Sequence, residues 1–118
     1  MGFTLQTAIS ELRRAVPEFA IDAEWERDNL SYLAFGDFAR FICSEAEVLL
    51  YTTSDEEAHS LSKVPLCMSF LEQALEQSDS AGRDLVLDCI EALSACQWEE
   101  QIRQWAGPQV SAAWGYTR

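Results

Sequence analysis

The chain contains one histidine, and its spacing from an acidic residue is the first pattern that could do chemistry. Glu56 and His59 form a Glu-x-x-His pair, which in di-iron helical bundles projects two metal ligands from one helical turn. Such a site needs a second Glu-x-x-His pair, and a chain with a single histidine cannot supply it. We therefore predict a solvated acidic helix start here, with no metal bound.

Four cysteines, Cys43, Cys67, Cys89 and Cys96, are the next candidates for a reactive or metal-binding role. No Cys-x-x-Cys pair is present, so neither a zinc site nor a redox-active dithiol is indicated. Each cysteine lies among apolar residues, where a free thiol behaves as a small buried hydrophobe. Cys89 and Cys96 would lie about 10 Å apart along one helix axis, too far to bridge. We expect four reduced thiols.

Carboxylates remain as groups that could act as a general acid and base. They are densest in Asp22–Asp28, where Glu24, Glu26 and Asp28 flank Trp25. Catalytic carboxylates usually lie in a partly apolar cleft that moves their pKa values apart, whereas this segment is polar enough to stay in water. Known hydrolase, zinc-protease and phosphate-loop motifs are absent from the sequence. The sequence predicts no catalytic residue, no cofactor and no enzyme activity.

Charge is the strongest signal in the composition. Twenty acidic and eight basic residues give the chain a net charge of −12. This charge repels phosphate backbones and anionic lipid, so we expect no direct binding to nucleic acid or to a membrane surface. It favours the encounter with a basic protein. Solubility alone also explains an acidic surface, so both interpretations stay open.

Length and hydrophobic periodicity indicate the fold class. A chain of 118 residues with 48% hydrophobic residues has the size of one domain and can build a core without disulfide bonds or structural metal ions. Several segments repeat apolar residues at helical spacing, which predicts an all-α, compact single-domain bundle of five to six helices. No secretory signal or apolar run of roughly 18 residues is present, so we expect a cytoplasmic protein.

The clearest helical pattern lies in Ser78–Trp114. We expect Ser80 to cap a helix whose apolar face holds Leu85, Val86, Cys89, Ile90, Leu93 and Cys96. A further helix, Trp98–Ala106, is expected to end at Gly107-Pro108. Trp98 and Trp105 should pack on the core through this helix. Trp114 and Tyr116 are the best candidates for exposed aromatic anchors.

The first half of the chain predicts further helices. Thr4–Val16 should form the first, capped by Thr4 or Thr7, and Asn29 or Ser31 should cap a second. Its apolar side is expected to hold Leu30, Leu33, Ala34, Phe38, Phe41 and Ile42. Gly36 within it is expected to permit the close approach of another helix.

Two segments in the middle of the chain are interpreted from local signals and not from helical periodicity. Glu47–Thr53 is β-prone but has no evident partner strand, so a helix is preferred. Ser54 and Glu57 have the spacing of a capping box, which predicts a helix start. After Pro65 another apolar stripe holds Leu66, Cys67, Phe70, Leu71, Ala74 and Leu75, and Glu72 is expected on the opposite, solvated side.

Three groups of residues could meet a basic partner, although each is also explained as a solvated surface. The first is a row of acids at helical spacing in Ser80–Ala95, the second a helix start, and the third the cluster around Trp25. The candidate partner-binding residues are Asp84, Asp88, Glu91, Asp55, Glu56, Glu57, Glu24, Trp25, Glu26 and Asp28.

Two short motifs in the second half of the chain resemble a known family. Ile90-Glu91-Ala92-Leu93 lies in one predicted helix, and Gly107-Pro108-Gln109-Val110-Ser111-Ala112-Ala113-Trp114 opens the last. This pattern, within Val64–Trp114, is similar to small helical immunity proteins of bacterial polymorphic-toxin and contact-dependent inhibition systems. The resemblance implies a stoichiometric cytoplasmic inhibitor that binds a cognate toxin with a basic surface. It carries no binding residue that can be placed on this sequence.

Two other functions stay open. A helical protein-interaction adaptor or regulatory module, including a nucleic-acid mimic, would show the same charge and helical pattern. An enzyme with a carboxylate pair would need an apolar cleft that holds both groups.

Overall fold

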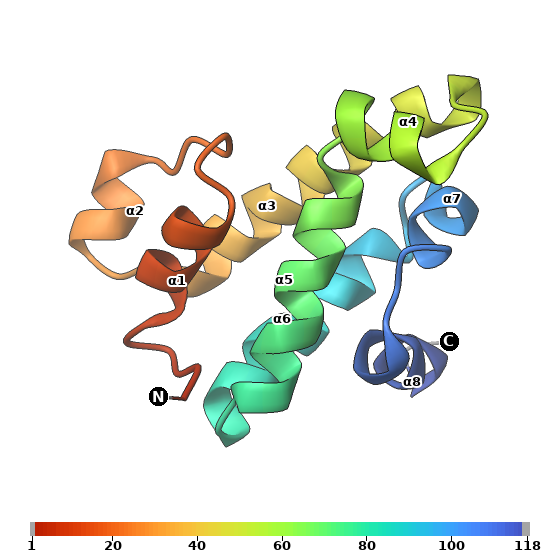
Figure 1. The fold of residues 1–118 in the computed structure, drawn as a ribbon. Helices are drawn as coiled ribbons and strands as arrows, with labels where there is room; N and C mark the ends of the chain where they lie inside the picture. Colours follow the sequence, from red (N-terminus) through yellow and green to blue (C-terminus); the bar gives the residue numbers. More distant parts are fainter. Residues whose placement is uncertain (1, 117–118) are drawn as a thin grey trace.

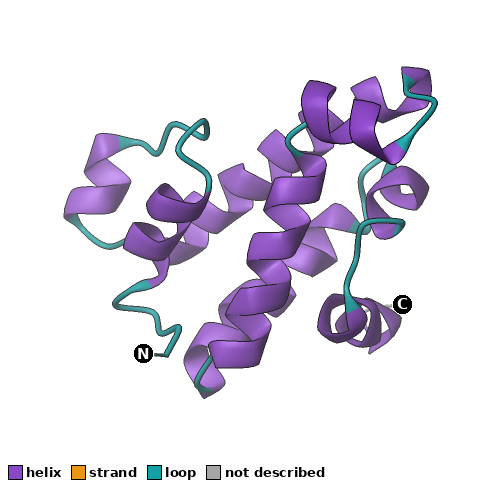
Figure 2. Cartoon of the chain, in the orientation of Figure 1, coloured by secondary structure: helices purple, strands orange, loops and turns teal. Residues whose placement is uncertain are grey.

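The computed structural model describes residues 2–116, and helices joined by short loops make up the molecule (Figure 1, Figure 2). The described chain has no strand, only an isolated bridge between Phe3 and Ser78. The all-α prediction is confirmed, and the six helices of seven residues or more match the predicted five to six. The elements are α1 (Ala8–Ala15), α2 (Ala23–Arg27), α3 (Ser31–Ala46), the 3₁₀-helix η1 (Glu47–Tyr51), α4 (Asp55–Leu61), α5 (Val64–Gln77), α6 (Ser80–Leu93), α7 (Glu99–Arg103) and α8 (Pro108–Tyr116).

The buried side chains form one hydrophobic cluster that extends from Phe3 to Trp114. Its centre is the contact between α3 and α6, the most extensive of all helix pairs. Phe3 joins the starts of both helices, because its ring lies 6.0 Å from that of Phe35 and its carbonyl accepts the Asp79 N–H. The two helices therefore run in parallel from this point. No helix among residues 2–116 is long and apolar enough to cross a bilayer.

The ends of α3 and α6 are joined by a disulfide between Cys43 and Cys96. The prediction of four reduced thiols is therefore wrong for these two residues. The bond links the last turns of α3 to the loop after α6, so it depends on the parallel packing of two helices that are distant in the sequence. Cys67 and Cys89 are free and buried, as predicted.

Two helix starts differ from the predicted caps. Asp79, not Ser80, is the N-cap of α6, and its carboxylate accepts the Gly82 N–H at 2.7 Å. Leu30 occupies the N-cap position of α3, and the Ser31 hydroxyl donates to the distant carbonyl of Leu5 instead of capping the helix. The segment Phe3–Leu5 contacts both helix starts, because the Phe3 carbonyl accepts the Asp79 N–H and the Leu5 carbonyl accepts the Ser31 hydroxyl.

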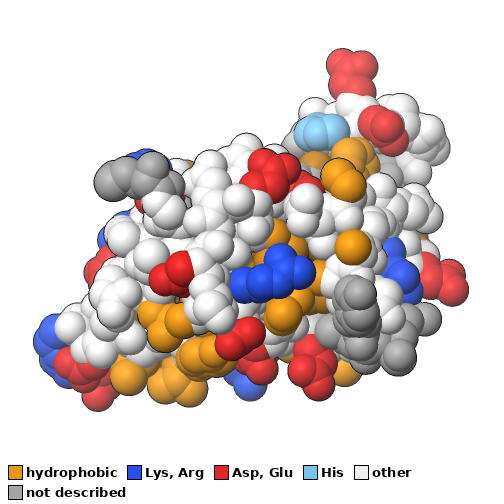
Figure 3. Space-filling view, turned by 90° about the horizontal axis from the view of Figure 1, so that it is seen from below, with side chains coloured by type: hydrophobic (Ala, Val, Ile, Leu, Met, Phe, Trp, Pro, Cys, Tyr) orange, Lys and Arg blue, Asp and Glu red, His pale blue; other side chains and the backbone are white. Residues whose placement is uncertain are grey.

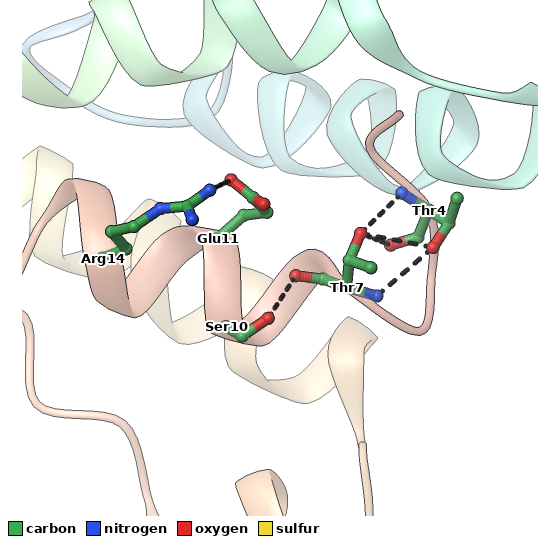
Figure 4. A network of polar contacts seen from close by, with 5 residues as sticks. All are labelled: Thr4, Thr7, Ser10, Glu11 and Arg14. Carbon is green, nitrogen blue, oxygen red and sulfur yellow. Dashed lines mark hydrogen bonds and ion pairs between the residues drawn. The ribbon is translucent and has the colours of Figure 1, made fainter. Parts of the chain in front are cut away.

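The first helix begins later than predicted. Thr7 holds the N-cap position of α1, but its hydroxyl bonds with Thr4 and makes no cap hydrogen bond to the helix. Figure 4 shows this pair, the Ser10 hydroxyl that donates to the Thr7 carbonyl, and the ion pair of Arg14 with Glu11. Thr4–Thr7 thus forms a turn that precedes α1.

The start of α4 confirms the predicted capping motif. The Ser54 hydroxyl accepts the Glu57 N–H at 3.1 Å, and the Glu57 carboxylate accepts the N–H of Thr53 at 3.1 Å. The preceding segment is the 3₁₀-helix η1, so the preference for a helix over a strand at Glu47–Thr53 is confirmed.

One aromatic residue near the C-terminus, Trp114, is more buried than predicted. Trp114 is fully buried, so its assignment as an exposed anchor is wrong. Its indole N–H donates to Glu99 at 3.0 Å, and the Arg103 guanidinium lies 5.3 Å from its ring centre. The side chain of Tyr116 lies outside the described part of the chain. Trp98 and Trp105 flank α7 and pack partly buried against the core, as predicted.

Candidate protein-binding surface

The acidic row on α6 faces solvent. Asp84, Asp88 and Glu91 are exposed, and the buried residues of α6 point to the opposite side of the helix. None of the ion pairs found within residues 2–116 involves these three carboxylates. The charges of all three residues are therefore exposed to solvent.

The cluster around Trp25 forms a short helix, α2. Asp22 caps it by accepting the Glu24 N–H at 2.9 Å. The Trp25 side chain is half-buried against the core, while the acids around it are exposed. Arginines partly neutralise these acids, since Arg13 pairs with Glu26 at 2.7 Å and Arg27 lies beside both Glu24 and Asp28.

The third group forms the first turn of α4. Asp55, Glu56 and Glu57 lie at the positive end of this helix, where carboxylates are favourable. The His59 ring nitrogen Nδ1 lies 2.8 Å from the Asp55 carbonyl oxygen, and the ring meets Trp105 edge-on at 4.9 Å. The described residues contain no group of three or more His, Cys, Asp or Glu that could hold a metal ion. These acids therefore have a local structural role at the helix start.

The fold separates these groups in space. Figure 1 shows α2 and α4 at opposite ends of the molecule, whose longest dimension is 40 Å. A partner must therefore span most of this length to contact both α2 and the acids of α4. The acidic row of α6 belongs to the helix that packs along α3 between these ends.

An apolar groove beside α2 is a feature that the sequence analysis missed. It encloses about 340 Å³, and its lining residues are Leu5, Gln6, Asn29, Leu30, Ser31, Tyr32 and Leu33. Leu30 and Leu33 were predicted to be core residues, and this prediction is wrong, because 38% and 52% of their surface is exposed. A signal was present in the sequence: Leu33 shares a helix face with Asp37, Arg40 and Ser44, at spacings of four, three and four residues.

Figure 3 views the molecule from below and shows hydrophobic side chains gathered at its lower left, with charged side chains on both sides of them. This is the side on which Figure 1 draws α1, α2 and the start of α3. The apolar surface is therefore bordered by charge and is not a broad hydrophobic face.

Two other hollows have carboxylates among their lining residues. One, of about 390 Å³, lies between η1, α4 and α7, and Asp55 is the one ionisable residue among those that line it. The other, of about 500 Å³, is lined by His59, Glu72 and Glu76 among others. Both carboxylate oxygens of Glu72 accept backbone N–H groups of α8, at 2.8 and 2.9 Å, so this residue holds the fold together.

We compared the chain with family models, with curated proteins and with solved structures, and none of them matches.

Proposed function

We propose that this chain is an immunity protein, which binds a cognate bacterial toxin domain and neutralises it by stoichiometric inhibition. The observation that carries the proposal is the row of exposed carboxylates on α6, which no ion pair within residues 2–116 neutralises, in a chain of net charge −12. The resemblance of Ile90–Leu93 and Gly107–Trp114 to small helical immunity proteins supports the same function. The inhibitor makes and breaks no covalent bond and needs no cofactor.

The physical basis of such inhibition is complementary charge. A toxin that cleaves nucleic acid or consumes nucleotides has a basic cleft, and an acidic protein is drawn to that cleft at a raised association rate. Once bound, the inhibitor keeps substrate from the cleft. A few well-packed contacts, and not the total charge, then determine how slowly the complex dissociates.

The proposed site of action is the cytoplasm, where the toxin would act. The disulfide of Cys43 with Cys96 argues for an oxidising compartment instead, because cytosolic reductants keep most thiols reduced. Alkylation of thiols at the moment of cell lysis, followed by mass spectrometry, separates the two locations. A reduced pair in cells supports the cytoplasm, and an oxidised pair contradicts it.

A second candidate function is a regulatory module that mimics nucleic acid. The regular row of Asp84, Asp88 and Glu91 favours it, since evenly spaced negative charges along a rod present the pattern that a nucleic-acid-binding protein recognises. Such a mimic would compete with DNA or RNA for a partner that need not be toxic.

Growth rescue tests the proposed function. The toxic C-terminal domain encoded next to this gene is expressed with and without the chain, and the two proteins are purified together. We expect normal growth only on co-expression and a stable complex with one copy of each protein. Absence of a toxin gene in the neighbourhood, or a toxin that kills cells despite ample inhibitor, would contradict the immunity function. Displacement of DNA from a non-toxic partner would favour the mimic.

A further inference from the structure

The start of α3 exposes large apolar side chains that the core does not use. Leu30, Tyr32 and Leu33 are 38%, 47% and 52% exposed and line one groove together with Leu5. The groove volume, about 340 Å³, lies at the lower end of the range of roughly 300–1,000 Å³ for ligand pockets. It therefore suits an anchoring side chain better than a whole cofactor.

The two walls of the groove are held together by hydrogen bonds. The Asn29 side-chain amide and the Ser31 hydroxyl both donate to the carbonyl oxygen of Leu5, at 3.3 and 3.1 Å. Asn29 also has a φ of 52°, a left-handed conformation that asparagine adopts more readily than most other residues. A groove fixed in this way loses little conformational entropy when a partner fills it, which favours binding.

The surroundings of the groove are acidic. Five acidic residues and one arginine lie between Asp22 and Asp37, and the pairing of Arg13 with Glu26 and of Arg40 with Asp37 leaves a local charge of about −2. The start of α6 adjoins Phe3, whose carbonyl accepts the Asp79 N–H and whose ring lies 6.0 Å from that of Phe35. The segment that contains the groove residues Asn29–Leu33 therefore carries net negative charge, and its acids are called the rim of the groove.

We propose that this groove is a docking site for an apolar side chain, leucine to tryptophan in size, carried on a lysine- or arginine-rich surface of a protein partner. The inference rests on the proposed function only in requiring a basic protein partner, and that partner need not be a toxin. The groove supplies apolar burial and the rim pairs with the flanking cations, which is the arrangement of a buried hot spot inside a polar ring.

The same charge disfavours the other occupants of an apolar groove. A second copy of this chain also carries −12, and the two negative rims would repel each other in a dimer built on this face. Anionic lipid is repelled for the same reason. A cationic partner gains from both the groove and the rim.

A peptide titration tests the site. The probe is a short amphipathic peptide of lysine and leucine, and two control peptides replace its leucines with serine or its lysines with glutamate. We expect the lysine–leucine peptide to shift the amide resonances of Leu5 and Asn29–Leu33 in ¹⁵N-labelled protein. The affinity of each control peptide should be lower by a factor of about ten or more, because it lacks either the anchor or the cations.

Matched variants locate the binding on the protein. Leu33→Ser should weaken the lysine–leucine peptide about tenfold, while Leu61→Ser should leave it unchanged, since Leu61 is similarly exposed, at 57%, but lies on α4. Thermal melting confirms that both variants fold.

Several results would overturn the docking site. One is that Leu33→Ser binds the lysine–leucine peptide as tightly as the unchanged protein does. Another is that the resonance shifts centre on η1 and α4. A third is that the serine–lysine peptide binds as tightly as the lysine–leucine peptide, which would show attraction by charge alone. A concentration-dependent dimer abolished by Leu33→Ser would assign the groove to self-association and would also overturn it. No toxin is present in this experiment, so failure of the growth-rescue test leaves its outcome unaffected.

Discussion

Glu72 of α5 caps the start of α8, and Gly107 provides the space for its carboxylate. Oε2 accepts the Gln109 N–H at 2.8 Å and Oε1 accepts the Val110 N–H at 2.9 Å. A Cβ at residue 107 would lie 2.6 Å from Cδ of Glu72. A side chain from one helix thus satisfies the free backbone donors of another, 37 residues away in the sequence.

Replacement of Glu72 with alanine should destabilise the protein by about 1–3 kcal/mol. The change removes two charge-assisted hydrogen bonds and leaves N–H groups of α8 without their acceptor. Urea denaturation followed by circular dichroism measures the loss. Glu76→Ala, an exposed change on the same helix, is the control and should stay within about 0.5 kcal/mol.

A double-mutant cycle with Gly107→Ala checks the geometry of this cap. The added methyl group displaces the carboxylate, so Gly107→Ala should be costly with Glu72 present and much less costly in the Glu72→Ala background. Additive free energies of unfolding would show that residue 107 and Glu72 do not compete for the same space.

Loss of the Cys43–Cys96 disulfide should lower the free energy of unfolding by about 4 kcal/mol. The bond closes a loop with a sequence separation of 53, and such a link restricts the unfolded chain. The double variant Cys43→Ser/Cys96→Ser and the reduced native protein should unfold at similar urea concentrations. As a control, reductant should not change the stability of the double variant. Equal stability of the oxidised and reduced native protein would contradict the expected contribution.

Cys67 and Cys89 should resist alkylation in the folded protein. Burial raises the pKa of both thiols, that of Cys89 to about 12, where the nearby Asp88 carboxylate adds to the effect. Alkylation requires the thiolate, so the reaction should stay slow even above pH 9, where an ordinary cysteine is mostly ionised. Mass spectrometry after iodoacetamide treatment should find no label on the folded protein. Two labels should appear in urea without reductant, and rapid labelling of the folded chain would show that these sites open.

Leu93→Ala should destabilise the fold by about 2–5 kcal/mol, because Leu93 is fully buried at the end of α6 and its truncation leaves a cavity. Leu61→Ala removes the same atoms from an exposed position and serves as the control. The melting temperature of each variant gives the comparison. An unchanged melting temperature for Leu93→Ala would mean that this side chain contributes no packing energy.

Reversal of the α6 charges should slow toxin association if the chain is an immunity protein. In the triple variant Asp84, Asp88 and Glu91 become lysine, which removes attraction to a basic surface and lowers the salt dependence of the association rate. Stopped-flow fluorescence measures that rate at several salt concentrations. Folding should persist, since all three residues are exposed.

The matched control makes the same change in net charge on η1 and α4, with Glu47, Asp55 and Glu56 replaced by lysine. All three are exposed on η1 and α4. A larger effect in this control than in the α6 variant would place the toxin interface at α4.

The sequence by itself determined the features that depend on neighbouring residues. Helical periodicity identified α5 and α6 and the burial of Leu93, because a helix places residues three and four apart on one face. The cap of α4 by Ser54 was predictable for the same reason, since both of its partners lie within one turn. The acidic row on α6 followed from spacing alone.

Only the tertiary structure decided the features that join distant segments. The disulfide of Cys43 with Cys96 required the parallel packing of α3 and α6, and the cap by Glu72 required α8 to begin against α5. Leu33 was misplaced because apolar character predicts burial only when another element covers that face, and here none does. Helix formation is governed by contacts within a few residues, whereas side-chain pairing and exposure are governed by how the helices pack.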